Sequence, residues 1–383
     1  MLRAGVSVLV GALSTALLVT ACDDPTDSRS DPTAGPPPPS SGAPPPSVLD
    51  PLSGSPTPTP RSVTIAVAGD VHFEGVLRDR LDEPASALAP VTTALAAADV
   101  AVVNLETSVG DGGRPDPDKR YTFQAPASAL AALAAAGIDV ATMANNHSLD
   151  YGLESLPSTF AAMTSAAMDV PPLAVVGIGR DAEEAFRPAR SDVDGTLVAT
   201  IGATVAELDP TADPTGHWAA TSTSPGTADA VDPTRLLRAV ERADGSADVV
   251  VVYMHWGIQG DRCPTAGQRS LAARLVERGA DVVVGSHAHN LQGAGRLAGG
   301  YVAYGLGNYA WYRTSAGTGA DTGVLTLTVQ PASSRTGRAT VTDADWEPAR
   351  IGVDGLPGPV TDSQAEAFGA ELEALRSCAG LAG

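Results

Sequence analysis

The stretch GADVVVGSHAH, residues 279–289, decides the expected fold because it joins a run of valines directly to two histidines. Three consecutive β-branched residues at 282–284 are typical of a buried strand. Gly285 ends the apolar run, and the polar turn after it carries His287 and His289, two positions apart. A buried strand followed at once by side chains that can bind metal is an order that recurs along the chain.

Five other places between residues 63 and 308 show the same order. The apolar runs and the turns after them are 63–68 with 69–72, 100–103 with 104–106, 140–143 with 144–147, 249–253 with 254–257, and 301–304 with 305–308. Helical patterns lie between them at 85–98, 128–136 and 268–278, and glycine follows the last two. Alternating strands and helices predict an α/β protein with a largely parallel sheet, whose ligands bind beyond the carboxyl ends of the strands.

The rest of the folded part is less regular. An alternating segment at 323–329 predicts a further strand, residues 362–376 predict a last helix, and 210–233 is expected to be a long loop. No repeat period and no second domain boundary is visible in the sequence.

The charge of the chain excludes one class of function. Its 383 residues include 24 basic and 44 acidic side chains, which gives a formal net charge of −20. Such a surface repels nucleic acid, so we expect no nucleic-acid partner. An anionic substrate would need a local positive centre to bind.

The N-terminus has the pattern of an export signal. Residues 1–3 form a short positive start, 4–21 are almost entirely apolar, and the run ends in VTAC at Cys22. This ending resembles the lipobox of bacterial lipoproteins, in which the cysteine is acylated and becomes the new N-terminus. An uncleaved anchor that spans the bilayer is the alternative. With residues 1–22 as a lipoprotein signal peptide, we expect a lipid-anchored protein on the extracellular face of the bacterial cell membrane.

Residues 23–60 are rich in Pro, Ser and Thr and cannot form a core. We expect them to be a disordered tether, followed by one folded domain at 61–383. Cys263 and Cys378 remain in that domain, and the sequence leaves open whether they form a disulfide.

The histidines point to metal chemistry, because five of the six lie in the turns that follow the strands; His217 does not. Imidazole and carboxylate donors together suit zinc, manganese or iron, and two such ions can activate a shared water and clamp a phosphoryl centre. The expected metal ligands are Asp70, His72, Glu106, Asn146, His255, His287 and His289. Glu106 is the candidate bridge between two ions, and His147 is the candidate general acid.

Further residues are weaker candidates for supporting contacts or for binding substrate. They are Asn104, Asn145, Asp150, Asn308 and Arg120. The asparagines could instead be turn formers, Asp150 a local cap and Arg120 a solvated loop residue. We expect His217 to be exposed and inert.

Seven stretches together resemble the CapA family, the poly-γ-glutamate capsule synthesis proteins of the calcineurin-like metallophosphatase superfamily. They are AGDVHFEG (68–75), VVNLETSV (102–109), KRYTFQAP (119–126), ATMANNHSLDYG (141–152), VVYMHWG (251–257), GADVVVGSHAHNLQG (279–293) and YGLGNY (304–309). The resemblance implies a metallophosphatase-like α/β/β/α sandwich. Asp70 and His72 match the first metal motif of the superfamily, Asn146 and His147 match its Asn-His pair, and the other three candidate histidines match its later ligands.

The chain also departs from the family pattern. Glu106 stands where the superfamily has a bridging aspartate motif, and many CapA relatives lack a histidine at position 72. Ile258 and Gln259 replace the usual Glu-Tyr, and GSHAH at 285–289 replaces GHHPH.

The leading functional hypothesis is an exported metal-dependent hydrolase of the phosphoesterase kind that acts in capsule polymer synthesis or export. Its expected partners are an anionic polymer or phosphoester substrate and a membrane polymer synthase. The alternatives are a non-catalytic accessory subunit that binds the nascent polymer or its synthase, and an exported phosphoesterase for other substrates.

Overall fold

β-Branched runs form the strands of two large sheets in the computed structural model, which describes residues 61–89, 93–205, 218–312, 317–334 and 337–383. The expected signal peptide with Cys22, the expected tether at 23–60 and His217 lie outside these residues. Within them, no helix combines the length and the hydrophobicity needed to cross a membrane.

The first sheet has the order β18-β17-β16-β1-β2-β5-β6, and β15 also pairs with β1. Its strands are β1 (Val63–Val71), β2 (Val100–Leu105), β5 (Val140–Thr142), β6 (Ala174–Val176), β15 (Asn308–Ala310), β16 (Asp321–Gln330), β17 (Thr340–Ile351) and β18 (Pro357–Pro359). The strands β1, β2, β5 and β6 are parallel, whereas β16, β17 and β18 add antiparallel pairs at one side.

The second sheet has the order β13-β14-β12-β11-β9-β8. It is built from β8 (Ala189–Val193), β9 (Thr196–Thr204), β11 (Val249–His255), β12 (Val282–Ser286), β13 (Ala294–Leu297) and β14 (Gly300–Ala303). The central strands β9, β11, β12 and β14 are parallel, and the edge strands β8 and β13 pair antiparallel. Two short pairs lie outside the large sheets: β3 (Ser108–Val109) with β4 (Gln124–Ala125), and β7 (Ile178–Gly179) with β10 (Gly226–Thr227).

The two sheets pack face to face because their strands are apolar on both sides. In β1, Val63, Ile65 and Val67 belong to the core between the sheets, and Ala66 and Ala68 face the helices. The strand β11 alternates in the same way, as expected for strands buried on both faces.

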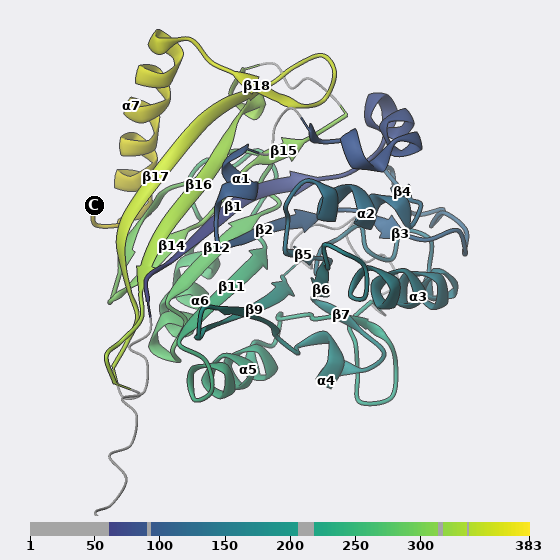
Figure 1. Cartoon of the computed structure of the whole chain (residues 1–383), viewed down its shortest axis with the longest axis horizontal. Helices are drawn as coiled ribbons and strands as arrows, with labels where there is room; N and C mark the ends of the chain where they lie inside the picture. Colours follow the sequence, from purple (N-terminus) through teal and green to yellow (C-terminus); the bar gives the residue numbers. More distant parts are fainter. Residues whose placement is uncertain (1–60, 90–92, 206–217, 313–316, 335–336) are drawn as a thin grey trace, which may run out of the picture. The chain divides into compact units, whose positions relative to one another are not determined.

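Helices cover the outer face of each sheet (Figure 1). The helices α1 (Thr93–Ala97), α2 (Ser128–Ala135) and α3 (Leu156–Ala166) pack on the first sheet, and α4 (Ala182–Ala185), α5 (Thr234–Asp244) and α6 (Ala266–Glu277) pack on the second. The last helix, α7 (Asp362–Ala379), contacts β13. This four-layer arrangement confirms the predicted α/β/β/α sandwich.

Three details differ from the sequence-based expectations. The helix predicted at 85–98 is a 3₁₀ turn at Pro84–Ser86 and the five-residue helix α1, with 90–92 outside the described residues. Pro90 lacks the backbone N–H that a continuous helix would need. The strand pattern by itself predicted one largely parallel sheet, whereas the strands form two mixed sheets, as the family resemblance implied. The long strand β9 was not predicted, because Thr and Gly interrupt its apolar pattern.

A disulfide joins Cys263, before α6, to Cys378 in α7 with the Cα atoms 5.8 Å apart. The question that the sequence left open is thus answered within this structure. The bond connects segments separated by 115 positions and ties the C-terminal helix to the second sheet's helical cover.

Asp281, just before β12, gives the stability of the domain a predictable pH dependence. Its side chain is buried and accepts a hydrogen bond from the Val250 N–H at 2.9 Å. Burial raises the pKa of Asp281 from its ordinary 3.8 to about 7. Between about pH 4 and 7 the folded protein therefore holds a proton that the unfolded chain has lost, so the free energy of unfolding falls as the pH rises.

Asp281→Asn removes this titration and keeps an acceptor for Val250. We expect the free energy of unfolding of the variant to fall less steeply with pH over that window, by up to about 1.4 kcal/mol per pH unit. Denaturant titrations of both proteins at pH 4 to 8 measure the difference. Parallel curves for parent and variant would contradict the prediction.

Candidate metal centre

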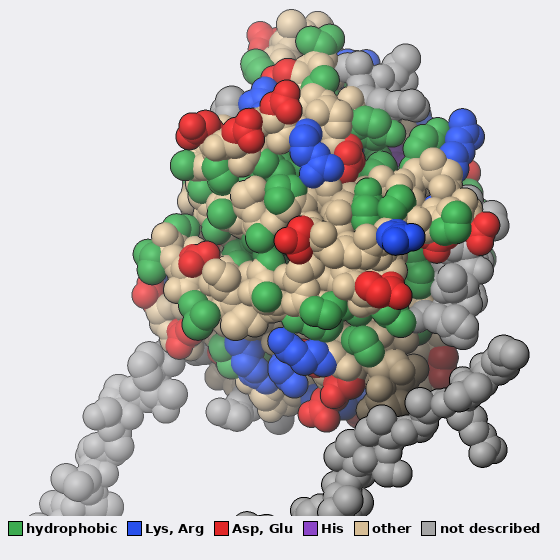
Figure 2. Space-filling view, turned by 90° about the vertical axis from the view of Figure 1, so that its right-hand side faces the viewer, with side chains coloured by type: hydrophobic (Ala, Val, Ile, Leu, Met, Phe, Trp, Pro, Cys, Tyr) green, Lys and Arg blue, Asp and Glu red, His purple; other side chains and the backbone are tan. Residues whose placement is uncertain are grey.

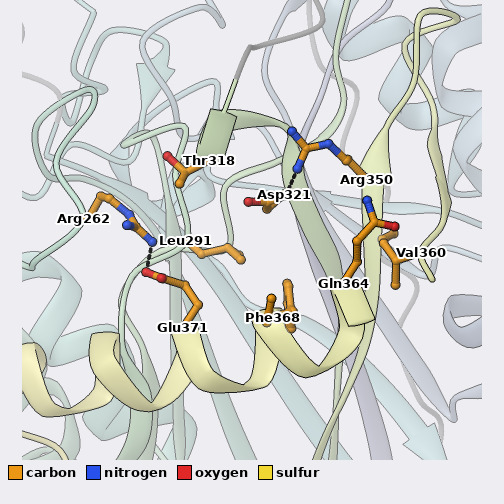
Figure 3. A pocket seen from close by; sticks show the side chains of 11 residues that line it. Arg262, Leu291, Thr318, Asp321, Arg350, Val360, Gln364, Phe368 and Glu371 are labelled. Carbon is orange, nitrogen blue, oxygen red and sulfur yellow. Dashed lines mark hydrogen bonds and ion pairs between the residues drawn. The ribbon is translucent and has the colours of Figure 1, made fainter. Parts of the chain in front are cut away.

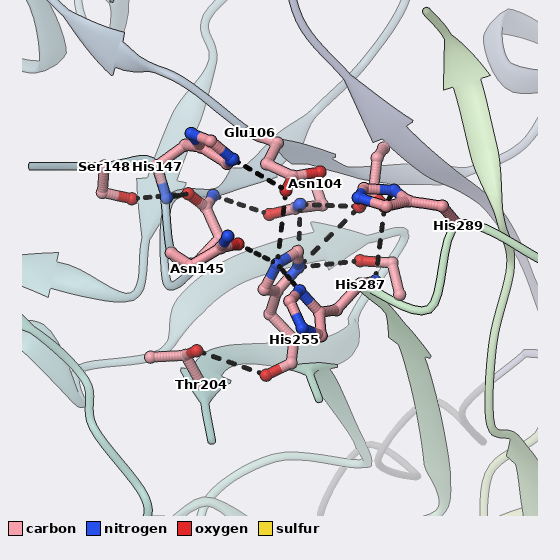
Figure 4. Close-up of polar contacts among 12 residues, drawn as sticks. Asn104, Glu106, Asn145, His147, Ser148, Thr204, His255, His287 and His289 are labelled. Carbon is pink, nitrogen blue, oxygen red and sulfur yellow. Dashed lines mark hydrogen bonds and ion pairs between the residues drawn. The ribbon is translucent and has the colours of Figure 1, made fainter. Parts of the chain in front are cut away.

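The strand ends of both sheets contribute side chains to one buried centre. From the first sheet come Asp70 in β1 and Glu106 directly after β2. From the second come His255, the last residue of β11, and His287 and His289 after β12. Figure 4 shows Glu106 and these three histidines pointing toward one another.

The ligand atoms fall into two overlapping clusters. Glu106, His255 and His287 form one, and Asp70, Glu106 and His289 form the other. Within each cluster the atoms that could bind metal lie within 4.8 Å of one another. Because Glu106 belongs to both, it has the position of a shared ligand. The amide of Asn146 lies at the first cluster, with its Oδ1 2.7 Å from His255 Nε2.

The surroundings of the Glu106 carboxylate show whether these residues are suited to binding a cation. Both of its carboxylate oxygens are fully buried and accept no hydrogen bond within the described part of the chain. The nearest ring nitrogens are His255 Nε2 at 3.5 Å and His147 Nε2 at 3.8 Å. Burial, and then the negative charge of Asp70, raise the pKa of Glu106 well above its usual value. A buried carboxylate without donors is costly, and a bound cation would remove that cost. The donor set therefore fits divalent metal.

The charges of Asp70 and His289 are mutually dependent. Burial alone would lower the pKa of His289, but the charge of Glu106 and the hydrogen bond with Asp70 raise it to about 9. Burial alone would raise the pKa of Asp70, but His289 and His255 hold it below its usual range. In the protein alone, the positive charge of His289 and the negative charge of Asp70 thus favour one another.

The turn that carries the two later histidines has a strained backbone. His287 has a φ of 93° and His289 a φ of 54°, a region that side-chain-bearing residues seldom adopt. Such strain is typical of functional sites held by their surroundings. Gly285, in β12 just before this turn, is also required, since a Cβ there would lie 2.3 Å from Trp256 Nε1.

Asparagines support the ligands. Asn104 donates to Asp70 Oδ1 at 2.7 Å, and Asn145 donates to Asn104 Oδ1 at 3.0 Å. The Oδ1 of Asn308 lies 2.8 Å from His289 Nδ1. Ser286, which was not predicted, places its hydroxyl 3.2 Å from His255 Nδ1. These contacts orient three of the candidate ligands.

His147 lies beside the ligand clusters, and Asp150 orients its ring from the side away from Glu106. Its Nδ1 is 2.6 Å from Asp150 Oδ2, and its Nε2 faces Glu106. The ring stacks on Phe123 with the centroids 4.1 Å apart. Burial raises the pKa of Asp150 to about 7, although the neighbouring Lys119 lowers it.

His72 is not brought into either cluster. Its Nδ1 is 3.0 Å from the Glu74 N–H and its Nε2 is 3.2 Å from the Tyr312 N–H. The ring packs in an aromatic group with Phe123, Trp311 and Tyr312. The two ring nitrogens of His72 thus face backbone N–H groups rather than the carboxylates of the centre.

Arg120 also lies away from the centre. Its guanidinium is exposed and lies over the ring of Tyr121, with 5.1 Å to the centroid. In contrast, the preceding residue, Lys119, was not predicted and is buried against Asp150. The available signal was that Lys119 is the single lysine in the chain.

The clustered ligands are buried, except that the His289 side chain is 20% exposed. Almost no histidine surface is visible on the face shown in Figure 2, where acidic and basic side chains alternate with apolar ones. A separate pocket of about 210 Å³ lies beside α7 (Figure 3). Its wall includes the ion pairs Arg262–Glu371 and Arg350–Asp321, and none of the clustered ligands lines it.

Solved structures with a similar course of the chain were found at low sequence identity. A novel phosphatase from Mycoplasma pneumoniae is 12% identical, covers 76% of this chain and 94% of its own, and has a TM-score of 0.44. A hypothetical protein from Thermus thermophilus is 16% identical, covers 74% and 99%, and has a TM-score of 0.42.

Curated relatives are more similar in sequence. Capsule biosynthesis protein CapA of Bacillus anthracis is 34% identical over 205 residues, 51% of this chain and 47% of that protein. PGA biosynthesis protein CapA of Bacillus subtilis is 32% identical over 203 residues, 51% and 50%. A probable polyglutamine synthesis accessory protein of Mycobacterium tuberculosis is 29% identical over 220 residues, 55% of each. The chain spans about half the length of the curated relatives it matches.

The family described as bacterial capsule synthesis protein PGA_cap matches residues 64–312. This range begins in β1, ends just after β15 and contains every residue of both ligand clusters. The family resemblance inferred from the motifs is confirmed. The chain belongs to the bacterial capsule synthesis protein family, PGA_cap.

Proposed function

We propose that this protein is a divalent-metal-dependent hydrolase of the phosphoesterase kind that acts on the extracellular side of the membrane in capsule polymer synthesis or export. The observation that carries the proposal is the Glu106 carboxylate, which is fully buried, accepts no hydrogen bond within the described residues and is shared by two ligand clusters. A carboxylate in that position is suited to bridging two cations.

The chain's own residues divide into two sets of metal ligands. Glu106, His255 and His287, with the Asn146 amide oxygen, would hold one ion, and Asp70, Glu106 and His289 would hold the other. The mixed nitrogen and oxygen donors suit manganese, zinc or iron. When bound, such ions make a water more acidic and stabilise the charge that develops on a phosphoryl group.

His147 is placed to handle the proton of the leaving group. Asp150 accepts the Nδ1–H of the ring, which leaves Nε2 directed toward Glu106 and the centre. When the ring is protonated on both nitrogens, the proton on Nε2 can pass to a leaving oxygen, which leaves the neutral ring with its Nδ1–H on Asp150. Phe123 on the face of the ring keeps bulk water away from it.

The proposed location and partners rest on sequence features and on the names of relatives. An apolar leader that ends at Cys22, followed by a Pro-rich tether, is typical of a lipid-anchored protein outside the cell membrane. The relatives named for capsule and PGA synthesis support an anionic polymer as the substrate or neighbour. A membrane polymer synthase is the partner we infer.

A non-catalytic accessory role is the second candidate. The Mycobacterium tuberculosis relatives carry the word accessory in their names, which favours it. In that role the metal centre would bind carboxylates of the polymer without cleaving a bond. The two candidates differ in whether the protein needs the imidazole of His147.

Removing the metal tests the main proposal. We expect the purified protein to bind about two manganese or zinc ions per chain and to hydrolyse bis(p-nitrophenyl) phosphate. A chelator should abolish hydrolysis, and added metal should restore it. Each bound ion, at 100 times its dissociation constant, should stabilise the fold by about 2.7 kcal/mol. A protein that binds no metal, as shown by elemental analysis and an unchanged melting temperature, would refute the proposal.

A further inference from the structure

Lys119 is the single lysine of the chain, and its side chain is 1% exposed. All other basic side chains are arginines, and most of those described lie at the surface. An ammonium group is strongly hydrated, so burying it costs several kcal/mol unless acceptors replace the water. A buried lysine therefore requires a set of partners that the fold has placed around it.

Those partners surround the Lys119 Nζ atom. It donates to Asp150 Oδ1 at 2.5 Å and to the backbone carbonyl of Asn146. It also lies 4.5 Å from the centroid of the Trp218 ring, within range of a cation–π contact. The three N–H bonds of an ammonium group thus have three partners. A planar guanidinium could not address the same three directions, which explains a lysine at this position.

Two of the partners belong to the segment that carries the chemistry. The backbone of Asn146 is held by Lys119, while its side-chain oxygen lies 2.7 Å from His255 Nε2. Asp150 is held through Oδ1, while its Oδ2 lies 2.6 Å from His147 Nδ1 and accepts the Phe123 N–H at 2.6 Å. The Lys119 ammonium group therefore fixes both Asn146, the candidate ligand, and the Asp150 carboxylate that contacts the His147 ring.

We propose that Lys119 is a positioning residue, whose buried ammonium sets the orientation of Asn146 and, through Asp150, the orientation and tautomer of His147. The inference rests on the proposed function for its catalytic consequence, because it assigns Lys119 to the same centre. Among the described residues, the polar and ring contacts of Lys119 are with Asn146 O, Asp150 and Trp218, none of which supplies a clustered ligand atom. It acts on the reaction only through the residues that it holds.

Lys119→Met keeps the length of the side chain and removes the charge. In metal-saturated protein we expect kcat for a phenyl phosphodiester to fall about 10- to 100-fold. This is the range seen when the hydrogen-bond partners of metal ligands are removed. KM should change less than about 3-fold. Arg114→Met is the matched control, since it makes a similar change at an exposed residue in the preceding loop. We expect the control to keep the kcat of the parent.

The single variant leaves Asp150 buried without its counter-charge and could fail to fold. The double variant Lys119→Met with Asp150→Asn removes both charges and should fold. The inference predicts that its kcat also stays at least about 10-fold below that of the parent. Parental kcat in either folded variant would overturn the inference.

A spectroscopic measurement separates this inference from the proposed function. Long-range ¹⁵N–¹H spectra of histidine-labelled, metal-free protein report which ring nitrogen of His147 carries the proton. We expect the proton on Nδ1 in the parent and in Arg114→Met, and a changed pattern in Lys119→Met or in the double variant. If the parent hydrolyses nothing, the proposed function fails, and this spectrum still decides the inference. An unchanged His147 signal in the variants would overturn it.

Discussion

Glu106→Gln is expected to lower hydrolysis of a phosphodiester by about 10³-fold and to reduce the bound metal to one ion per chain or none. The change keeps the volume of the side chain but removes the charge shared by both ligand clusters. The loss corresponds to several kcal/mol of charge stabilisation at the reacting centre, at 1.36 kcal/mol for each factor of ten. Activity and elemental analysis on the same protein sample measure both effects.

A second prediction concerns stability: without metal, Glu106→Gln should lose activity but not stability. In the metal-free parent, Glu106 is a buried carboxylate that accepts no hydrogen bond within the described residues. The metal-free variant should therefore unfold at the same or a higher denaturant concentration than the metal-free parent. With metal added, the parent should gain about 2.7 kcal/mol for each ion at 100 times its dissociation constant, and the variant should gain much less.

The control is Glu183→Gln, the same chemical change at an exposed position in α4. It should leave the metal content, the activity and the metal-induced stabilisation at the level of the parent. A Glu106→Gln protein that retains two ions and full activity would show that the shared carboxylate is not a ligand.

The sequence was sufficient to predict that Glu106, His255 and His289 lie together, although they are far apart in the chain. Each lies at or just after the carboxyl end of a buried strand, and the carboxyl ends of parallel strands open on the same edge of a sheet. It was not sufficient to assign those strands to two sheets. Strands such as β1 and β11 are apolar on both faces, so their local pattern does not reveal which neighbour they pair with.

His72 and Lys119 show the limits of reading residues from their spacing. Two positions separate Asp70 from His72, but the pairing of β1 with β15 is irregular between Asp70 and Val71, and the His72 ring packs among aromatic side chains instead. Lys119 lies in a loop rich in Pro and Asp, a composition typical of solvated segments. Only the tertiary fold places Asp150 and Trp218 around it.

His147→Asn should separate a catalytic protein from an accessory one. The Asn side chain can still donate a hydrogen bond to Asp150, as His147 Nδ1 does, but it lacks the Nε2 atom that faces Glu106. We therefore expect metal content to stay at the level of the parent and kcat to fall by about 10² to 10⁴, the usual contribution of a general acid.

The dependence on the leaving group identifies the role of His147 more sharply than the size of the loss. A p-nitrophenolate ion leaves readily without a proton, whereas a phenolate benefits from one. The fall in kcat should therefore be larger for the phenyl phosphodiester than for the p-nitrophenyl phosphodiester. His147→Ala, which lacks the donor to Asp150 as well, should show the same ratio between the falls in kcat for the two esters, with a lower stability.

If His147→Asn keeps its metal, hydrolyses both esters as fast as the parent and restores capsule production in a strain that lacks the protein, the accessory role is favoured. If capsule production fails while metal is retained, the chemistry at His147 is required, because the metal centre alone would then be insufficient.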